Sequence, residues 1–462
     1  MDSLPVEYIV KFGVGFLVSA LISYVVISSN KNLLSIRFLN IYYTLQFLFI
    51  IFFLLSLPES RGICRQGHQY YLRDSVNLLI PVYILFQIGT LLGASIIKII
   101  APGSQKLPDL VSILHLKPKM IELASIFFAL MFFAYPYVKI GSGIGYAIAI
   151  IFNYAQFMPF IGGATFKWNK FSSILWVISL GNLFFLGMIS GSRGTALLGL
   201  ACFAIGFFFS LRSPFQKKLY LSLLIVIALP LTTVISLVGH LRHTVGRVSF
   251  DKIDAEYIKK AFKVYQIAQR KNIFQSKKIE KELSEQGVGR YVNLVNMTTL
   301  LTVPAHYPHI GFEDMDLDLS YVFDLAFISG TKPQDLVDRK VLNYRLNNFG
   351  YWLNTDYSVE YSIVTDAWIR FAWAGIFFYA FTYSFFVSII EIAIRTFWRR
   401  IPTFVVISTL CLCLSAFYSY AYTIWLNVRL VVLGVAYAII ICLVIYFLFN
   451  LVFKDNIKYK FL

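Results

Sequence analysis

The sequence predicts an all-α integral membrane protein, and three observations support this fold class: the composition, the long apolar stretches and the distribution of basic residues. Of the 462 residues, 58% are hydrophobic and only 14% are charged. A water-soluble core does not need so much apolar surface. Aromatic residues make up 17% of the chain, and they suit lipid-facing contacts and the interfacial belt of a membrane protein.

About eleven stretches of the chain are apolar and, at roughly 20 residues each, long enough to cross a bilayer. They cover residues 6–28, 38–57, 76–100, 120–138, 143–163, 172–191, 195–211, 219–239, 366–390, 401–420 and 430–452. The sixth and seventh are nearly continuous, so the GSRG sequence between them is expected to form a tight turn. The N-terminus lacks the basic leader and cleavage site of a signal peptide, so the first stretch is expected to remain as a transmembrane helix.

The basic residues alternate between the connections, and this alternation predicts the topology. One set of connections holds seventeen Lys and Arg residues, whereas the short segments of the other set hold seven. The positive-inside rule places the richer set in the cytoplasm. The N-terminus and the GSRG turn are then outside, and the C-terminus is inside. The predicted organisation is an N-terminal bundle of about eight spans (1–239), a large extracytoplasmic loop (240–365) and a C-terminal bundle of about three spans (366–462).

The large outer loop is rich in basic residues and histidines, which runs against the usual bias of outer segments and indicates an anionic partner. Its first residues, GHLRHTVGR, place His240, His243 and Arg247 on one face if they are helical. Asp366 and Arg370 lie where the loop returns to the membrane. Ionisable residues at the edges of several spans favour a functional site, although such residues also snorkel harmlessly to the interface.

A helix with an apolar stripe is expected within this loop, from about residue 252 to 285. The stripe consists of Ile258, Ala261, Phe262 and Tyr265, and lysines surround it. Basic amphipathic helices of this kind rest on membrane surfaces. The stripe is equally compatible with a helix that packs on the rest of the loop.

Cofactors, metals and nucleic acid are not expected. The five cysteines lie mostly inside apolar runs and match neither a disulfide framework nor a zinc site. Asp314, Asp316 and Asp318 resemble a metal-binding motif of soluble glycosyltransferases, but they lie outside, where nucleotide sugars are absent. Neither a Walker A motif nor a dinucleotide fingerprint is present. The formal charge of +17 follows the membrane topology and does not form a nucleic-acid patch.

Chemistry outside the cytoplasmic membrane requires a donor that arrives already activated, such as a polyprenyl-diphosphate-linked glycan. Its transfer expels a diphosphate, and arginine offers phosphate oxygens a permanently charged, planar fork of donors. The candidate diphosphate-binding residues are Arg193, Arg242, Arg247, Arg290, Arg339 and Arg345. A histidine or carboxylate would orient or deprotonate an acceptor hydroxyl, and the candidate catalytic residues are His243, His306 and Asp366.

Three features of the chain resemble the O-antigen polymerase (Wzy) family and, more distantly, the O-antigen ligases. They are SGSRGTALL between two mid-chain spans, the large penultimate outer loop, and the return to the membrane through SIVTDAWIRFAWAGIFFYAF. Arg339, followed after ten residues by Gly350, is similar to an arginine–glycine pattern of these polymerases. Ala372 departs from the family, which has a glycine at that position.

The resemblance implies a GT-C-like fold in the bacterial inner membrane, with a periplasmic active site and a role in lipopolysaccharide biosynthesis. The implied reaction is metal-independent transfer of a polyprenyl-diphosphate-linked glycan onto the non-reducing end of an incoming lipid-linked repeat unit. The implied partners are undecaprenyl-diphosphate-linked oligosaccharide and membrane lipids. The sequence leaves open the sugars, the linkage and whether a chain-length regulator protein takes part.

Other functions remain open alternatives. An O-antigen ligase shares the same expected chemistry. A flippase for the same lipid-linked glycan would place ionisable groups at mid-membrane and repeat its halves, whereas the spans here are almost free of charge inside. A scaffold for glycan assembly would make the crowding of arginine and histidine accidental.

Overall fold

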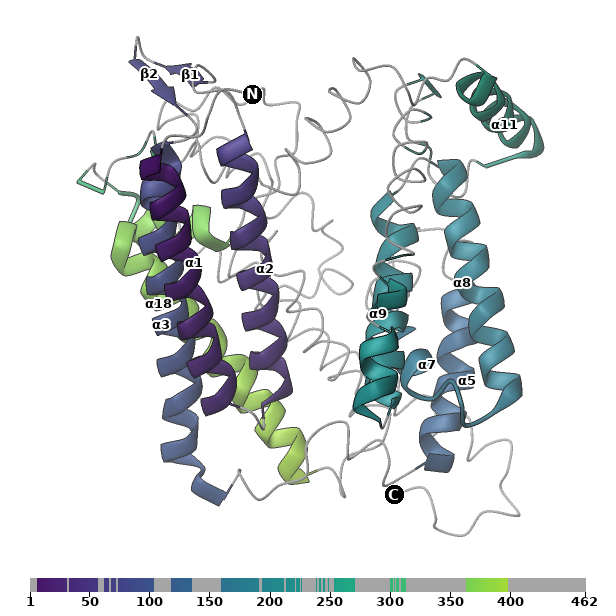
Figure 1. Cartoon of the computed structure of the whole chain (residues 1–462). Helices are drawn as coiled ribbons and strands as arrows, with labels where there is room; N and C mark the ends of the chain where they lie inside the picture. Colours follow the sequence, from purple (N-terminus) through teal and green to yellow (C-terminus); the bar gives the residue numbers. More distant parts are fainter. Residues whose placement is uncertain are drawn as a thin grey trace. The chain divides into compact units, whose positions relative to one another are not determined.

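The computed structural model (Figure 1) describes residues 6–30, 33–56, 62–65, 68–71, 74–103, 118–134, 159–190, 193–211, 213–220, 253–270 and 363–397, together with short pieces between 222 and 248 and between 300 and 312. Most of the described residues are helical. The chain forms two compact units. The first comprises Met1–Leu110, Val288–Arg400 and Leu412–Ala436, and the second comprises Val111–Gly287, Ile401–Cys411 and Tyr437–Leu462.

The described residues of the first unit form four long helices, namely α1 (Val6–Ser29), α2 (Leu34–Ser56), α3 (Ser75–Ile100) and α18 (Ile363–Phe397), which are labelled in Figure 1. They enclose a continuous apolar core that also includes Leu300 and Val303 from the loop. A short antiparallel hairpin precedes α3, with β1 (Gly62–Arg65) paired to β2 (His68–Tyr71). Apart from this hairpin, the described elements are helices, which agrees with the expected all-α class.

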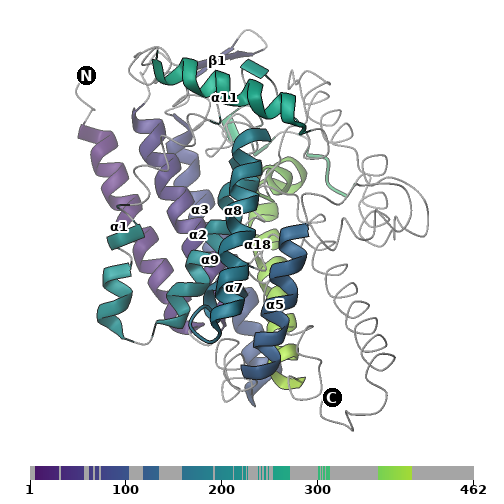
Figure 2. The same ribbon diagram turned by 90° about the vertical axis from the view of Figure 1, so that its right-hand side faces the viewer.

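The second unit contains α5 (Pro118–Ala134), α7 (Pro159–Ala164), α8 (Lys170–Ser190), α9 (Arg193–Ser210) and α11 (Ala255–Arg270). Figure 2 shows α11 lying across one end of α8. Buried hydroxyls join α5 to α8, since Trp176 Nε1 donates to Ser125 Oγ over 2.8 Å and Ser179 Oγ donates to the Ala129 carbonyl over 2.8 Å. These bonds satisfy polar groups inside an otherwise apolar bundle.

Three of the described helices are long and apolar enough to cross a membrane: α3, α8 and residues Ile363–Ala393 of α18. Their bounds agree with the expected stretches to within a few residues. Helix α8 ends at Ser190 and α9 begins at Arg193, so the two mid-chain stretches are separate helices. Arg193 and Gly194 of the GSRG sequence belong to α9, and Gly191 and Ser192 lie outside the described residues. The expected stretches at 401–420 and 430–452, and most of those at 143–163 and 219–239, lie outside the described residues. A total of about eleven spans therefore stays a prediction.

Close contact between α3 and α18 depends on two glycines one helical turn apart. A Cβ atom on Gly89 would lie 2.6 Å from the Phe377 carbonyl oxygen, and one on Gly93 would meet the Phe381 carbonyl and Ser384 Oγ. From Gly89 to Gly93 along α3, the contacted residue on α18 moves forward in sequence from Phe377 to Phe381. The two helices therefore run parallel. Small residues at such crossings allow membrane helices to approach closely without a side chain between them.

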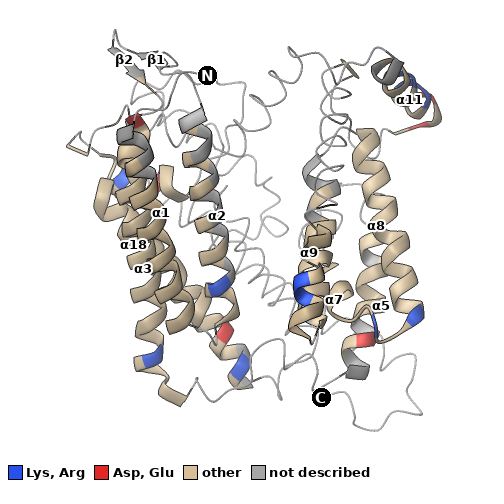
Figure 3. Cartoon of the chain, in the orientation of Figure 1, with Lys and Arg blue, Asp and Glu red and all other residues tan. Residues whose placement is uncertain are grey.

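Basic residues lie at neighbouring ends of helices in the first unit, where Figure 3 shows Lys and Arg in blue on α2, α3 and α18. Lys98, near the end of α3, donates to the carbonyl of Ser29 at the end of α1. Glu391, near the end of α18, accepts hydrogen bonds from the Leu34 and Ser35 amides over 2.8 and 2.9 Å, which caps the start of α2. The predicted alternation requires these helix ends to share one side of the membrane.

Basic residues also lie together at one end of α9 in the second unit. Lys167 Nζ lies 5.4 Å from the ring centre of Phe207, and Lys217 Nζ lies 5.5 Å from that of Phe208. The two lysines come from connections that the basic-residue count assigns to one side. Arg193 begins α9, so its backbone lies at the opposite end of that helix.

Candidate functional site

A break in α18 creates an irregular site near the start of this helix. Phe371 has φ −141° and ψ 15°, and Ala372 has φ 49° and ψ −129°. Residues with a side chain rarely adopt a positive φ, and this region of backbone space belongs almost entirely to glycine. Beyond the break, a Cβ on Gly375 would collide with the Ala367 carbonyl. The strained backbone persists because the surrounding contacts hold it.

The loop residues 309–312 satisfy the backbone carbonyls that precede this break. The amide of Ile310 donates to the carbonyl of Ile369 over 3.2 Å, and the amide of Gly311 donates to that of Arg370 over 3.0 Å. A buried carbonyl in a membrane helix requires such a partner when the regular ladder is interrupted. The segment 309–312 therefore serves as a strap across the break, and we refer to it as the strap below.

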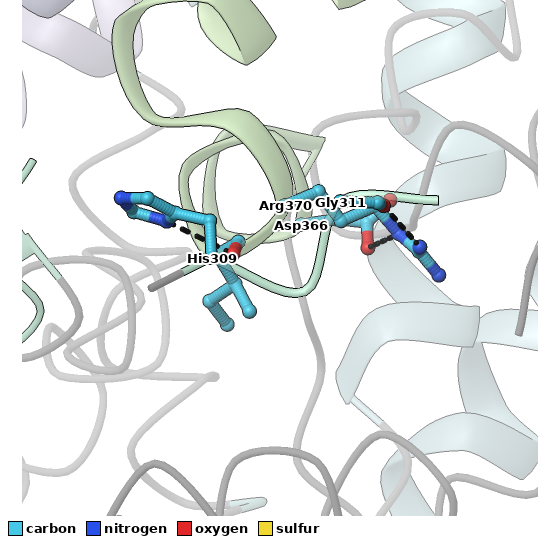
Figure 4. Close-up of polar contacts among 5 residues, drawn as sticks. His309, Gly311, Asp366 and Arg370 are labelled. Atoms are coloured by element: carbon cyan, nitrogen blue, oxygen red, sulfur yellow. Dashed lines mark hydrogen bonds and ion pairs between the residues drawn. The ribbon is translucent and has the colours of Figure 1, made fainter. Parts of the chain in front are cut away.

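A buried ion pair lies beside the strap (Figure 4). Arg370 Nε is 3.3 Å from Asp366 Oδ1, and the two side chains are 2% and 4% exposed. Arg370 Nη1 donates to the Gly311 carbonyl over 3.0 Å. The guanidinium thus joins the carboxylate of its own helix to the strap, and its planar fork of donors suits this double role.

His309 attaches the strap to α18 a second time (Figure 4). Its Nδ1 lies 3.0 Å from the Ile369 carbonyl oxygen, and its Nε2 lies 3.2 Å from the Ala305 carbonyl oxygen. Both partners are acceptors. A neutral imidazole carries one N–H and donates to one of them, whereas only the doubly protonated ring donates to both.

Apolar and aromatic contacts fix the neighbouring loop residues on α18. Trp368 Nε1 donates to the Val303 carbonyl over 2.7 Å, and both residues are buried. The ring centre of Phe312 lies 4.8 Å from that of Phe371 in an edge-to-face arrangement. The loop therefore meets α18 before the strap, at Val303, and within it, at Phe312, and the indole has a partner for its polar N–H.

The structure places two of the predicted site residues on this part of the chain. Asp366 lies in the centre of the cluster, but its side chain is buried and bonded to Arg370. His306 is exposed, three residues before the strap. Arg370 and His309 were not among the predicted site residues, although the sequence shows Arg370 one helical turn after Asp366 and His309 three residues after His306.

Arg193 is the first residue of α9, directly after the connection from α8. Its side chain lies outside the described residues, as do Arg242, His243, Arg247, Arg290, Arg339 and Arg345. The neighbouring end of α8 is covered by the loop, whose residues satisfy three terminal carbonyls: Met188 with Tyr265 Oη (2.6 Å), Ile189 with Tyr257 Oη (3.2 Å) and Ser190 with the Val248 amide (3.2 Å). The last carbonyls of a helix need such partners.

Three of the four residues of the apolar stripe of α11 face the protein. Ala261 is fully buried with Ile189 and Leu241, and Ile258 and Tyr265 pack against this cluster. The interpretation of the stripe as a membrane-resting surface is therefore wrong for these positions, because α8 and the loop cover them. Phe262 departs from the stripe and is 48% exposed. Lys259, Lys260 and Lys263 are exposed on the outer face of the helix.

Burial changes the acidity of the two tyrosines at this contact. It raises the pKa of Tyr265 to about 12, with a smaller contribution from neighbouring Tyr257. Burial also raises the pKa of Tyr257. Both phenols therefore remain protonated donors toward the α8 carbonyls at physiological pH.

Comparison of the chain with protein-family models, with curated proteins and with solved structures finds no match. Within the described residues, no three His, Cys, Asp or Glu side chains lie close enough together to hold a metal ion.

Proposed function

We propose that this protein is a membrane glycosyltransferase that polymerises lipid-linked oligosaccharide repeat units, as the O-antigen polymerases do. It transfers a glycan from its polyprenyl-diphosphate carrier onto the non-reducing end of an incoming lipid-linked unit. The reaction takes place at the periplasmic face of the bacterial inner membrane. Arginines, with Arg193 foremost, stabilise the departing diphosphate, and no metal or cofactor takes part.

The observation that carries this proposal is the strained break in α18, where the strap meets a buried Asp366–Arg370 pair. Ionisable groups in a membrane-spanning segment are costly and are retained mainly where they have a function. Backbone strain of this kind also concentrates at functional sites. The strap fixes the loop on α18. A fixed loop suits an enzyme that must bring a lipid-linked substrate to residues of that loop.

The burial of Asp366 and Arg370 supports a division of roles. Because both side chains are almost fully enclosed, they serve as positioning residues in this proposal and do not touch the substrate. His306 is exposed on the same loop and is available to accept the proton of an acceptor hydroxyl. General-base assistance of this type contributes about 10²–10⁴-fold to a rate.

The location of Arg193 at the start of α9 supports its role toward the diphosphate. The first amides of a helix have no acceptor within the helix, and the helix dipole favours negative charge at this end. An arginine there adds a permanent positive charge to the same region. The combination suits an anionic leaving group better than it suits a neutral sugar.

The test is incubation of the purified protein in lipid nanodiscs with lipid-linked repeat units as the only substrate, in the presence of a chelator. A polymerase produces a ladder of glycans that differ by one repeat unit. A ligase produces a new species only when a lipid A core acceptor is added, and a flippase alters the sidedness of the substrate without any covalent product. Either of the last two results would replace the proposed function.

A further inference from the structure

We infer that His309 is a positioning residue, which ties the turn that carries His306 to the break in α18. This inference rests on the proposed function in one respect, because that function assigns the proton-accepting role to His306. The attachment of this turn to α18 is a property of the fold, and it can be measured without an assay of enzyme activity.

The two ring nitrogens of His309 join parts of the chain that are far apart in sequence. The Nδ1 contact of 3.0 Å reaches Ile369 in α18, sixty residues away. The Nε2 contact of 3.2 Å reaches the Ala305 carbonyl, four residues earlier in the loop. His306 follows Ala305 directly, so one imidazole connects the peptide beside His306 to the membrane helix.

Of the two contacts, the one through Nδ1 anchors the loop to α18. The Nε2 contact lies within the loop and does not reach the helix. At Ile369, the carbonyl accepts from both His309 Nδ1 and the Ile310 amide. Loss of the Nδ1 donor would leave the strap attached through the 310 and 311 amides and the Arg370 guanidinium, which weakens it without removing it.

Two isosteric substitutions separate the contacts. The side-chain nitrogen of asparagine occupies the position of Nδ1, whereas that of glutamine occupies the position of Nε2. His309→Asn therefore keeps the donor toward Ile369, and His309→Gln keeps the donor toward Ala305. His309→Phe retains an aromatic ring and removes both ring nitrogens. Ala305→Ser is the matched control, because it changes an exposed side chain and keeps the carbonyl.

The first readout is hydrogen–deuterium exchange of the peptide that contains residues 309–312, measured on the full-length protein in nanodiscs. We expect His309→Phe and His309→Gln to accelerate exchange of the 310 and 311 amides about tenfold, as the loss of one hydrogen bond does. His309→Asn and Ala305→Ser should exchange as the native protein does. Native exchange in His309→Phe, or equal protection by Asn and Gln, would overturn the assignment.

The second readout is the rate of glycan joining. We expect His309→Phe to lower kcat about 10- to 100-fold, with KM almost unchanged, because misplacement by about 1 Å has effects of that size. His309→Asn should join glycans at nearly the native rate. Within a His306→Ala background, His309→Phe should lower the rate no further, since coupled residues are not additive. A full additional loss in that background would overturn the positioning role.

The two readouts distinguish failure of this inference from failure of the proposed function. If the native protein joins no glycans, the proposed function fails, and the exchange pattern alone decides whether His309 ties the strap. If glycans form normally while His309→Phe leaves exchange unchanged, the proposed function stands and His309 has no such role.

Discussion

Arg370 Nε lies 3.3 Å from Asp366 Oδ1, one helical turn away, and both side chains are enclosed at the point where α18 breaks. Removing charges from water is costly, and their mutual attraction offsets the cost only when both partners are present. The Gly311 carbonyl provides a further acceptor for the guanidinium. The pair therefore depends on the strap as well as on the helix.

Substitution of either charged residue alone should destabilise the protein strongly. Asp366→Leu and Arg370→Leu should each lower the free energy of unfolding by about 3–5 kcal/mol, because each removes one side of a buried ion pair. The double variant should lose much less than the sum. Unfolding of the four proteins in mild detergent gives this cycle, and additive losses would show that the two side chains do not stabilise each other.

Ala372→Gly should stabilise the protein. Ala372 has φ 49°, and glycine adopts such a conformation without the cost of roughly 1–3 kcal/mol that a side chain brings. The matched control is Ala374→Gly, two residues further along the same helix, which should destabilise by about 1 kcal/mol through helix propensity. The two thermal midpoints in detergent should shift in opposite directions. Equal destabilisation by both variants would mean that residue 372 has an ordinary helical backbone in solution.

Arg193→Ala should abolish polymer formation while expression and membrane insertion remain normal. Removal of one preorganised donor from a developing negative charge lowers rates by about 10²–10³-fold in other enzymes. Arg193→Lys should also be impaired, because a point charge does not replace a planar fork. Lys170→Ala, at the other end of α8, is the control and should keep activity. Long glycans from Arg193→Ala would remove Arg193 from the mechanism.

The contact between α11 and α8 should weaken in alkaline solution. Burial raises the pKa of Tyr265 to about 12, above its ordinary value of 10.0. Its contribution to stability is therefore fully present below about pH 10 and is lost as the pH rises toward about 12, because the unfolded chain ionises first. Thermal midpoints across this range should fall less steeply in Tyr265→Phe than in the native protein. The control Tyr24→Phe removes an exposed tyrosine of α1 and should leave the slope unchanged; an identical slope in Tyr265→Phe would contradict the prediction.

Among the described residues, hydropathy predicts the long helices well, because an apolar run with polar or glycine boundaries has few other stable forms in a membrane. The ends of α8 and α9 illustrate this, since the GSRG sequence separates two such runs. The hairpin was missed, although Gln66 and Gly67 provide the two-residue spacing of a tight turn between short strands. Both strands are too short to give a periodic signal.

The site was predictable only in part. Asp366 was identified from its place at the edge of a span, but no break in the helix was predicted at Ala372. The break itself leaves no hydropathy signal, because the residues around it remain apolar. The roles of His309 and Gly311 depend on contacts with residues about sixty positions away, and a single sequence does not show which distant segments meet.

The most direct test of the account is the number of carrier molecules released as purified protein joins lipid-linked repeat units in nanodiscs without nucleotide sugar. We expect one polyprenyl diphosphate for each new linkage, in step with the growth of the glycan ladder. A ladder that requires a nucleotide sugar, or the absence of both ladder and released diphosphate, would contradict it.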